Sequence, residues 1–170
     1  MRRIFVIADT HFGHENSWKK FKREDGITPL RPFTSTEEMD ETMVANWNAV
    51  VQPSDHVYHL GDVAIAKKNL ATVKRLNGHK RLVRGNHDIF DTRDYIDAGF
   101  DEIYGVRVFP AHNMIFSHIP LHPDSLNQRG WTNIHGHLHA NKVKGDWAEL
   151  YRCVSVEHTN YTPVLAFPES

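Results

Sequence analysis

Short apolar runs of the strand type alternate with helical patterns along the first hundred residues of the chain. A run rich in β-branched residues occupies residues 3–8, shorter strand-type runs occupy 57–60 and 81–84, and each leads into a polar residue or a glycine. Buried strands have this pattern where they deliver side chains to the edge of a sheet. The sequence therefore predicts three buried strands with polar residues at their ends.

Helices are predicted between and after these strands. Ser35 and Glu38 have the spacing of a capping box, and the apolar residues after them recur at helical intervals up to Pro53. A second helix is expected over 69–76, where an Asn-Gly pair follows as a stop signal. A third is expected over 91–98, capped by its first residue and closed by a glycine.

The second half of the chain has a different character, because strand-type runs dominate it. These runs occupy residues 103–109, 113–117, 131–135, 149–156 and 163–167. Residues 16–33 have no regular period and are expected to form a loop over a site, or an insertion. No linker or internal repeat interrupts the pattern, which predicts one mixed α and β domain over residues 1–170, with sheets covered by helices.

The composition narrows the class of protein. The length of 170 residues fits one domain, and 20 Lys+Arg against 21 Asp+Glu give a net charge of −1, which argues against binding through a large basic field. No apolar run approaches the roughly 20 residues of a membrane span, and the N-terminus does not resemble a signal peptide. The single cysteine, Cys153, excludes a disulfide framework and a multi-cysteine zinc site. A cytoplasmic protein without a membrane partner is expected.

Histidine is the unusual residue, since the chain contains 13 of them. Several stand in five short motifs that each follow a strand-type run: Asp9-Thr10-His11, Gly61-Asp62, Gly85-Asn86-His87-Asp88, Ser117-His118 and Gly136-His137-Leu138-His139. Loops at strand ends converge on one crevice in α/β folds. Carboxylates, imidazoles and an amide suit borderline or hard divalent ions, and a set of this size suits two ions about 3.5–4 Å apart, as used for displacement at phosphorus.

Three of these residues also have a simpler interpretation. Asp9 and Asp62 are residue types that commonly form turns at strand ends. A lone histidine such as His118, after an apolar run, is commonly a core residue with its hydrogen bonds satisfied. Three other histidines compete with His118 for the same place in the pattern: His112, His122 and His135.

The five motifs, in this order, resemble those of the calcineurin-like metallophosphoesterase family, whose pattern is D-x-H, GD, GNH with a following acid, H, and GH-x-H. The resemblance extends from Asp9 to His139 and is nearest to the small single-domain prokaryotic and phage branch. The second motif continues as GDVAIAK, without the acid and arginine of the protein-phosphatase branch, so that activity is not expected. The resemblance implies an α/β fold, a four-layer αββα sandwich in which helices flank two mixed β-sheets.

The family's site residues carry over to the matching positions. The resemblance implies a first metal held by Asp9, His11, Asp62 and His139. It implies a second metal held by Asp62, Asn86, His118 and His137, so that Asp62 bridges the pair. A hydroxide bridging the two ions would attack phosphorus in line. The implied catalytic residues are His87, which would stabilise or protonate the leaving oxygen, and Asn86, which would touch a phosphate oxygen.

Candidate substrate-binding residues are His14, Arg84, Asn86 and His87. His14 follows the first motif in the run DTHFGH, and Arg84 directly precedes the third motif. For His14 the alternative is a surface or turn role, and for Arg84 it is a side chain that faces the sheet.

The sequence therefore predicts a metal-dependent phosphoesterase that hydrolyses phosphodiesters, with nucleotides as candidate substrates. The alternatives are a phosphomonoesterase with the same site and a non-catalytic metal-binding scaffold protein. The expected cofactors are two divalent ions from among Mn, Fe, Ni and Zn, with Mn favoured. A small phosphoester is the expected partner, and nucleic acid is less favoured because the net charge of −1 provides no broad basic groove. Specificity is expected to reside in the loops 16–33 and 121–131.

Overall fold

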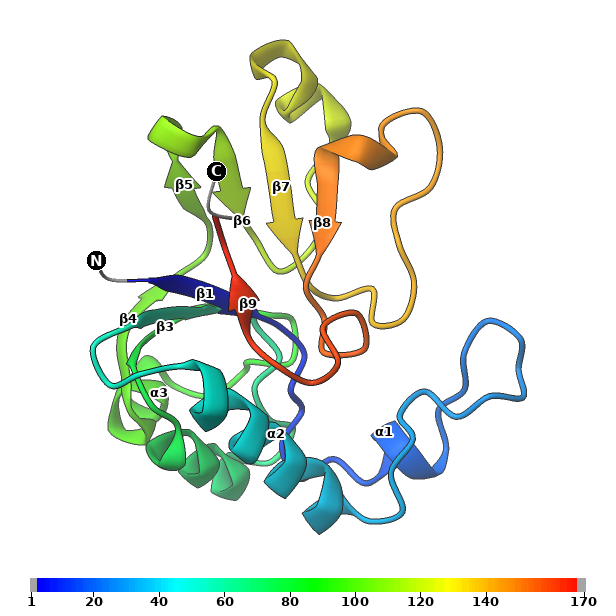
Figure 1. Ribbon diagram of the computed structural model, residues 1–170, viewed down its shortest axis with the longest axis vertical. Coiled ribbons are helices and arrows are strands. Elements are labelled where there is room, and N and C mark those ends of the chain that lie inside the picture. Colours follow the sequence, from blue (N-terminus) through cyan, green and yellow to red (C-terminus); the bar gives the residue numbers. More distant parts are fainter. Residues whose placement is uncertain (1–2, 168–170) are drawn as a thin grey trace.

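Two mixed β-sheets form the centre of the computed structural model, which describes residues 3–167 (Figure 1). The first sheet has the order β4-β3-β2-β1-β9 and consists of β1 (Ile4–Ile7), β2 (His56–His59), β3 (His79–Val83), β4 (Phe100–Tyr104) and β9 (Val164–Leu165). Strands β1 to β4 are parallel to one another, and β9 is antiparallel to β1.

The second sheet has the order β5-β6-β7-β8. It consists of β5 (Arg107–Phe109), β6 (Met114–Phe116), β7 (Thr132–His135) and β8 (Tyr151–Cys153). Strands β6 to β8 are parallel, and β5 is antiparallel to β6.

Helices lie outside the two sheets. The longer ones, on the first-sheet side, are α2 (Thr36–Val50), the 3₁₀ helix η1 (Lys67–Arg75) and α3 (Thr92–Ala98). Short 3₁₀ helices accompany the second sheet: η2 (Pro110–His112), η3 (Pro123–Ser125), η4 (Asn127–Arg129) and η5 (Ala148–Leu150). A further short helix, α1 (Asn16–Lys19), lies apart from these at the base of the projecting 20–30 segment (Figure 1). The predicted α/β architecture, two mixed sheets with flanking helices, is confirmed.

Side chains of β1 alternate between two hydrophobic cores, which explains why this strand is apolar throughout. Phe5 and Ile7 pack in the core that the first sheet shares with the helices, together with Met43 and Trp47 of α2. Val6 points the other way, into the core between the sheets, which also contains residues of β6 and β7. Strand β1 is therefore buried on both faces, and its polar residues follow where the strand ends.

The capping box at the start of α2 forms as predicted. The Ser35 hydroxyl accepts a hydrogen bond from the backbone N–H of Glu38 at 3.0 Å, and the helix ends at Val50, before Pro53. The predicted helix over 69–76 is instead a 3₁₀ helix over Lys67–Arg75. Helix α3 begins after Asp91 as predicted, although the Asp91 side chain accepts no capping hydrogen bond.

Three strand predictions need correction. The run 103–109 is not one strand, because β4 pairs with β3 in the first sheet and the chain then crosses at Gly105 to form β5 in the second. The run 149–156 narrows to Tyr151–Cys153, because residues 148–150 wind into η5. The run 163–167 narrows to Val164–Leu165. None of the helices within residues 3–167 is long and apolar enough to cross a membrane.

Candidate metal centre

All seven predicted ligands lie at the carboxyl ends of strands, on the same edge of the two sheets. Asp9 and His11 follow β1, Asp62 follows β2, Asn86 follows β3, His118 follows β6, and His137 and His139 follow β7. Hydrogen bonds join these loops, since Asp9 N–H donates to Gly61 and Gly136 N–H donates to His118. The parallel strand order therefore brings residues 130 positions apart into one cluster.

The backbone is held in an unfavourable conformation at five of these residues. The φ angle is 59° at Asp9, 46° at His11, 58° at Asp62, 70° at His137 and 51° at His139. Side chains other than glycine rarely adopt this left-handed region, and such strain concentrates at functional sites. The turns thus aim the side chains of both D-x-H and H-x-H motifs toward a common point at a cost of order 1–3 kcal/mol for each residue.

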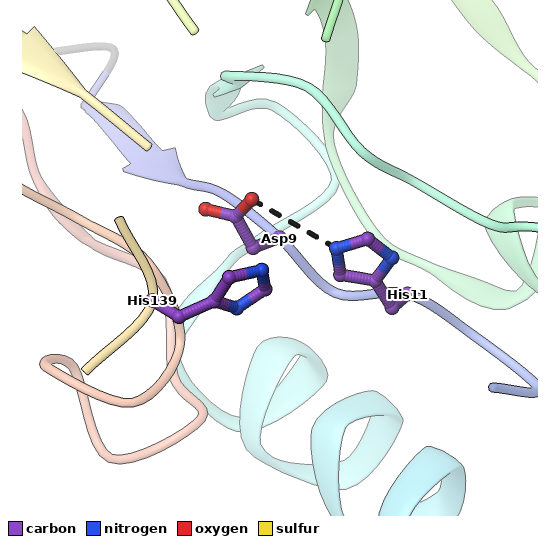
Figure 2. A group of neighbouring side chains, drawn as sticks. All are labelled: Asp9, His11 and His139. Atoms are coloured by element: carbon purple, nitrogen blue, oxygen red, sulfur yellow. Dashed lines mark ion pairs between the residues drawn. The ribbon is translucent and has the colours of Figure 1, made fainter. Parts of the chain in front are cut away.

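One half of the cluster contains Asp9, His11 and His139, whose ligand atoms lie within 4.8 Å of one another. Figure 2 shows the three side chains pointing toward one another, with Nε2 of His11 3.9 Å from Oδ1 of Asp9. The imidazole rings of His11 and His139 stack with centroids 5.2 Å apart. Asp62 joins this half through its Oδ2 atom, 3.5 Å from Nε2 of His11.

The other half contains His118, Asn86 and His137 around the same Asp62. Oδ2 of Asp62 lies 3.3 Å from Nε2 of His118. Oδ1 of Asn86 lies 2.9 Å from Nε2 of His118 and 2.9 Å from Nδ1 of His137. Asp62 therefore lies between the two halves, where the resemblance expects a bridging ligand, while Asp9 is also close enough to His118 to form a second candidate triad with Asp62.

Hydrogen bonds to Asp9, Asp62 and His118 engage one atom of each side chain and leave another to face the cluster. Oδ2 of Asp9 accepts from Ser155 Oγ at 2.7 Å and from the N–H of His137 at 2.9 Å, whereas Oδ1 has no hydrogen-bond partner among residues 3–167. Asp62 Oδ1 accepts from the N–H of His87, which leaves Oδ2 free to face both halves. Likewise Nδ1 of His118 bonds to the carbonyl of Leu60 at 2.8 Å, so its Nε2 faces the cluster.

This arrangement fits a divalent cation. Metal-binding histidines typically use their second nitrogen to hold a carbonyl or carboxylate, and His118 and His139 both do so. Nε2 of His11 has no hydrogen-bond partner in the described part of the chain, although it is buried. Buried polar atoms without partners are rare in native proteins. A cation between His11 and Asp9 would provide a partner for Nε2 of His11 and for Oδ1 of Asp9. Oxygen and imidazole donors without thiolate are the set that suits Mn²⁺, Fe, Ni²⁺ or Zn²⁺.

The electrostatics of the cluster show which protonation states a cation would change. Burial raises the pKa of the Asp9 carboxyl to about 6 and lowers the pKa of His11 well below its ordinary value, an effect to which Arg31 adds. Burial alone would raise the pKa of Asp62, but its hydrogen bond with His118 holds that pKa below the usual range. Metal binding needs ionised carboxylates and neutral imidazoles, and a cation would favour both states here.

Two glycines allow the motifs to pack this closely. A Cβ atom at Gly85 would lie 2.2 Å from Oδ1 of Asp62, and one at Gly136 would lie 2.6 Å from Oδ2 of Asp9. Neither carboxylate could keep its position beside a larger residue. The glycines of the GNHD and GHLH motifs are therefore required by the contact between loops.

A buried ion pair behind His139 was not identified from the sequence. Arg31 and Glu157 both have fully buried side chains, and Nε of Arg31 lies 2.8 Å from Oε1 of Glu157. The same carboxylate oxygen lies 3.2 Å from Nδ1 of His139, while the Arg31 guanidinium donates to the carbonyls of Thr10 and Asp9. Arg31 lies in the segment predicted as irregular and is 126 residues from Glu157, so no local pattern links the two.

Two further residues hold the site together without a predicted role. Asp88, the last residue of the GNHD motif, accepts hydrogen bonds from the N–H groups of Asp62, Val63 and Gly85, which ties two motif loops to each other. Ser155 holds Asp9, as described above. Asp88 was identifiable as part of the motif, whereas Ser155 carries no sequence signal of its own.

The predicted substrate-binding residues have different surroundings. His87 is exposed, and its ring meets that of His11 edge-on at 5.6 Å. The His14 ring lies 5.7 Å from the His11 ring. Arg84 instead donates to the carbonyls of Asp88 and Phe90, and its guanidinium lies 5.0 Å above the Tyr95 ring. These contacts give Arg84 a role in holding its own loop, and its substrate contact stays a prediction.

The competing histidines lie outside the cluster. His112 stacks on Phe167 at 3.8 Å, and the exposed His122 bonds to the N–H of Asp124 at the start of η3. Buried His135 bonds to the carbonyl of Gly136. Neither of the candidate ligand triads found among residues 3–167 includes any of them, whereas His118 belongs to one.

Two cavities border the cluster. One of about 500 Å³ lies between the segment 20–24 and the loop 137–141. The other, of about 330 Å³, is lined by residues that include Asn86, His118 and the exposed apolar side chains of Val106 and Ile119. A substrate at the cluster would thus have room on either side of it.

Comparisons with known proteins identify the family. The sequence matches the calcineurin-like phosphoesterase family over residues 2–165. An uncharacterised protein of Methanocaldococcus jannaschii is 38% identical over 172 residues, which cover 96% of this chain and 87% of that protein. The Gene 66 protein of Mycobacterium phage L5 is 29% identical over 93 residues, which cover 52% of this chain and 41% of that protein.

Solved structures share the fold. A protein of unknown function from Aquifex aeolicus has a TM-score of 0.66 and 25% identity, with 97% of this chain and 96% of that chain covered. The nuclease MPE of Pseudomonas putida has a TM-score of 0.51 and 20% identity, with 81% of this chain and 62% of that chain covered, a likeness of fold alone. With the family match extending over nearly the whole sequence and the motif residues clustered at one edge of two mixed sheets, this chain belongs to the calcineurin-like phosphoesterase family, whose members hydrolyse phosphoesters with divalent metal ions.

Proposed function

We propose that the protein is a phosphodiesterase with a dinuclear metal centre. The observation that carries the proposal is the complete set of seven oxygen and nitrogen ligands around Asp62, with no member replaced. Asp9, His11, Asp62 and His139 hold one ion, and Asp62, Asn86, His118 and His137 hold the other. When bound, two divalent ions of this kind lower the pKa of a water molecule that becomes the nucleophile and neutralise charge on the phosphoryl oxygens.

The chain's own residues orient the metal ligands, contact the phosphate and protonate the leaving oxygen. Ser155 and the His137 N–H fix Asp9 through one carboxylate oxygen, so the other keeps a constant direction. His87 lies on the exposed side of the cluster, next to His11, and donates the proton that the leaving oxygen requires. His14, whose ring also neighbours that of His11, contacts a phosphoryl oxygen. The Asn86 amide is exposed beside His118 and reaches the same phosphate.

A diester is favoured over a monoester because the cluster has a cavity on each side, one for each ester group. The phosphomonoesterase and scaffold interpretations remain the alternatives. Metal-stripped protein supplied with Mn²⁺ should hydrolyse bis-p-nitrophenyl phosphate in preference to p-nitrophenyl phosphate. Preference for the monoester would favour a phosphatase, and binding of Mn²⁺ without turnover of either ester would favour a scaffold.

The role of His87 has its own test. His87→Ala should lower kcat for bis-p-nitrophenyl phosphate by about 10²–10⁴-fold, the usual contribution of a general acid. The affinity for Mn²⁺ should stay within twofold of the wild-type value, because His87 is not among the proposed ligands. His79→Ala is the matched control, since His79 is an exposed histidine at the start of β3. A loss of Mn²⁺ affinity in His87→Ala as large as its loss of kcat would contradict the role of His87 as a general acid.

A further inference from the structure

The cavity of about 500 Å³ beside His137 and His139 is walled on its outer side by the segment 20–24. In Figure 1 this segment projects from α1 away from the sheets, opposite the loop that precedes η5. The volume of the cavity lies within the range of about 300–1,000 Å³ typical of small-molecule sites. A ligand in the cavity would contact two of the proposed metal ligands directly.

The outer wall of this cavity is basic. Lys20, Lys22 and Arg23 are exposed, and none of them has a carboxylate partner among residues 3–167. Glu24 is the one acidic residue among the lining residues, and it is paired with Lys144 at 3.0 Å. The wall therefore presents unpaired positive charge, although the whole chain has a net charge of −1. An anion within about 8 Å would experience this local charge without much screening.

The wall also presents an aromatic ring. Phe21 is 47% exposed, so about half of its side chain is open to a ligand in the cavity. Its backbone is fixed, because its N–H donates to Asn16 and its carbonyl accepts from Leu30. The Phe21 ring meets the His14 ring edge-on at 5.7 Å, and His14 lies 5.7 Å from His11. A line of rings thus leads from the cavity to the metal centre.

We propose that this cavity binds the nucleotide next to the scissile phosphodiester of a single-stranded nucleic acid, with its base stacked on Phe21 and its far phosphate held by Lys22 and Arg23. Basic residues interleaved with an exposed aromatic platform are the features that bind single strands. The inference rests on the proposed function, because the metal centre must cleave a diester for the cavity to matter to turnover. It also reconciles a nucleic-acid ligand with the balanced net charge, since the required charge is local.

The test measures how strongly the hexanucleotide dT6 inhibits hydrolysis of bis-p-nitrophenyl phosphate by the Mn²⁺-loaded enzyme. The double variant Lys22→Gln/Arg23→Gln should raise the inhibition constant of dT6 at least tenfold more than it changes kcat/KM for the small diester. Loss of the contacts to this one phosphate should also reduce the slope of log affinity against log salt by about 0.7. Phe21→Ala should weaken inhibition by dT6 about tenfold, because the stacking of a base on Phe21 is lost.

Lys68→Gln/Lys74→Gln is the matched control, because it removes the same charge from exposed lysines of η1, outside the cavity. An equal loss of dT6 affinity in this control would overturn the inference, and so would dT6 inhibition that is insensitive to the cavity variants. Inhibition by thymidine triphosphate as strong as by dT6 would identify a free nucleotide rather than a strand as the ligand, and would also overturn it.

Failure of the proposed function can be distinguished from failure of the cavity assignment. If the wild-type enzyme fails to hydrolyse bis-p-nitrophenyl phosphate with Mn²⁺, the proposed function fails. Binding of fluorescein-labelled dT6, followed by anisotropy with the same variants, then still tests the cavity. If the small diester is hydrolysed but no cavity variant changes the inhibition constant of dT6 more than it changes kcat/KM for the small diester, the cavity assignment alone fails.

Discussion

Nδ1 of His139 lies 3.2 Å from Oε1 of Glu157, a carboxylate with no exposed surface. Burial tends to raise the pKa of Glu157, but the charge of Arg31 lowers it to about 2. The carboxylate is therefore ionised and accepts a hydrogen bond from Nδ1–H of His139. This contact fixes the tautomer of His139 and leaves Nε2 to face the cluster. A carboxylate behind a metal-binding histidine is a common way to orient the ring and raise its basicity.

Glu157→Gln tests this relationship with little change in shape. The affinity for Mn²⁺, measured by titration calorimetry on metal-stripped protein, should fall by about 10–100-fold. Glu149→Gln, which removes an exposed carboxylate from η5, should leave the affinity unchanged. Wild-type Mn²⁺ affinity in Glu157→Gln would show that the contact does not support the metal centre.

Arg31 should matter for stability as well as for the site. Arg31→Met leaves the buried Glu157 charge without its partner, which typically costs about 3–5 kcal/mol of the free energy of unfolding. Adding Glu157→Leu to that variant should recover part of the loss, because the unpaired charge is then removed. Urea unfolding with EDTA present measures both. A double variant less stable than Arg31→Met would contradict the explanation.

Gly85 should not tolerate a side chain, because a Cβ atom there would lie 2.2 Å from Oδ1 of Asp62. Gly85→Ala should therefore displace the Asp62 carboxylate and lower kcat for bis-p-nitrophenyl phosphate by at least tenfold. Gly105→Ala is the control, since nothing lies within 4 Å of its Cβ position. Similar activity in the two variants would show that the close approach of the loops is not required.

His59 should make the fold sensitive to acid. Its Nδ1 accepts from the Gly61 N–H and its Nε2 bonds to Thr10, so both nitrogens are satisfied in the neutral ring. Burial lowers its pKa to about 3. The unfolded chain, with an ordinary histidine pKa near 6.5, binds the proton more readily, so stability is full above that value and falls as the pH decreases toward 3.

The expected contribution of His59 is about 2 kcal/mol of stability lost between pH 7 and pH 5. His59→Gln keeps hydrogen-bonding groups but cannot titrate, and its loss over the same interval should be smaller by that amount. Urea unfolding of both proteins at the two pH values, with EDTA present, gives the comparison. Equal losses in both proteins would contradict a buried neutral His59.

The parts of the fold that local pattern determines were predictable, and those that depend on tertiary contacts were not. The strands that end at Ile7 and His59 follow from short runs of the strand type, and the Ser35 cap follows from a fixed spacing. The break between β4 and β5 was missed, because the residues around Gly105 are apolar enough to read as one strand and only pairing in two different sheets separates them.

The same distinction applies to the site. The seven candidate ligands stand in short motifs, so their residue types and their order along the chain are informative by themselves. The groups that hold them are not, because Arg31 and Glu157 meet only through the fold and Ser155 reaches Asp9 across 146 residues. The basic wall at 20–24 was hidden by the balanced net charge of the whole chain.

The most direct test of the metal centre is a Mn²⁺ titration of metal-stripped protein in which bound metal and hydrolysis of bis-p-nitrophenyl phosphate are measured on the same samples, with Asp62→Asn beside the wild type. We predict two bound ions per chain, hydrolysis that appears only with bound metal, and at least a hundredfold loss of hydrolysis in Asp62→Asn. Full hydrolysis by wild-type protein in excess EDTA, or wild-type rates in Asp62→Asn, would contradict a metal centre built around Asp62.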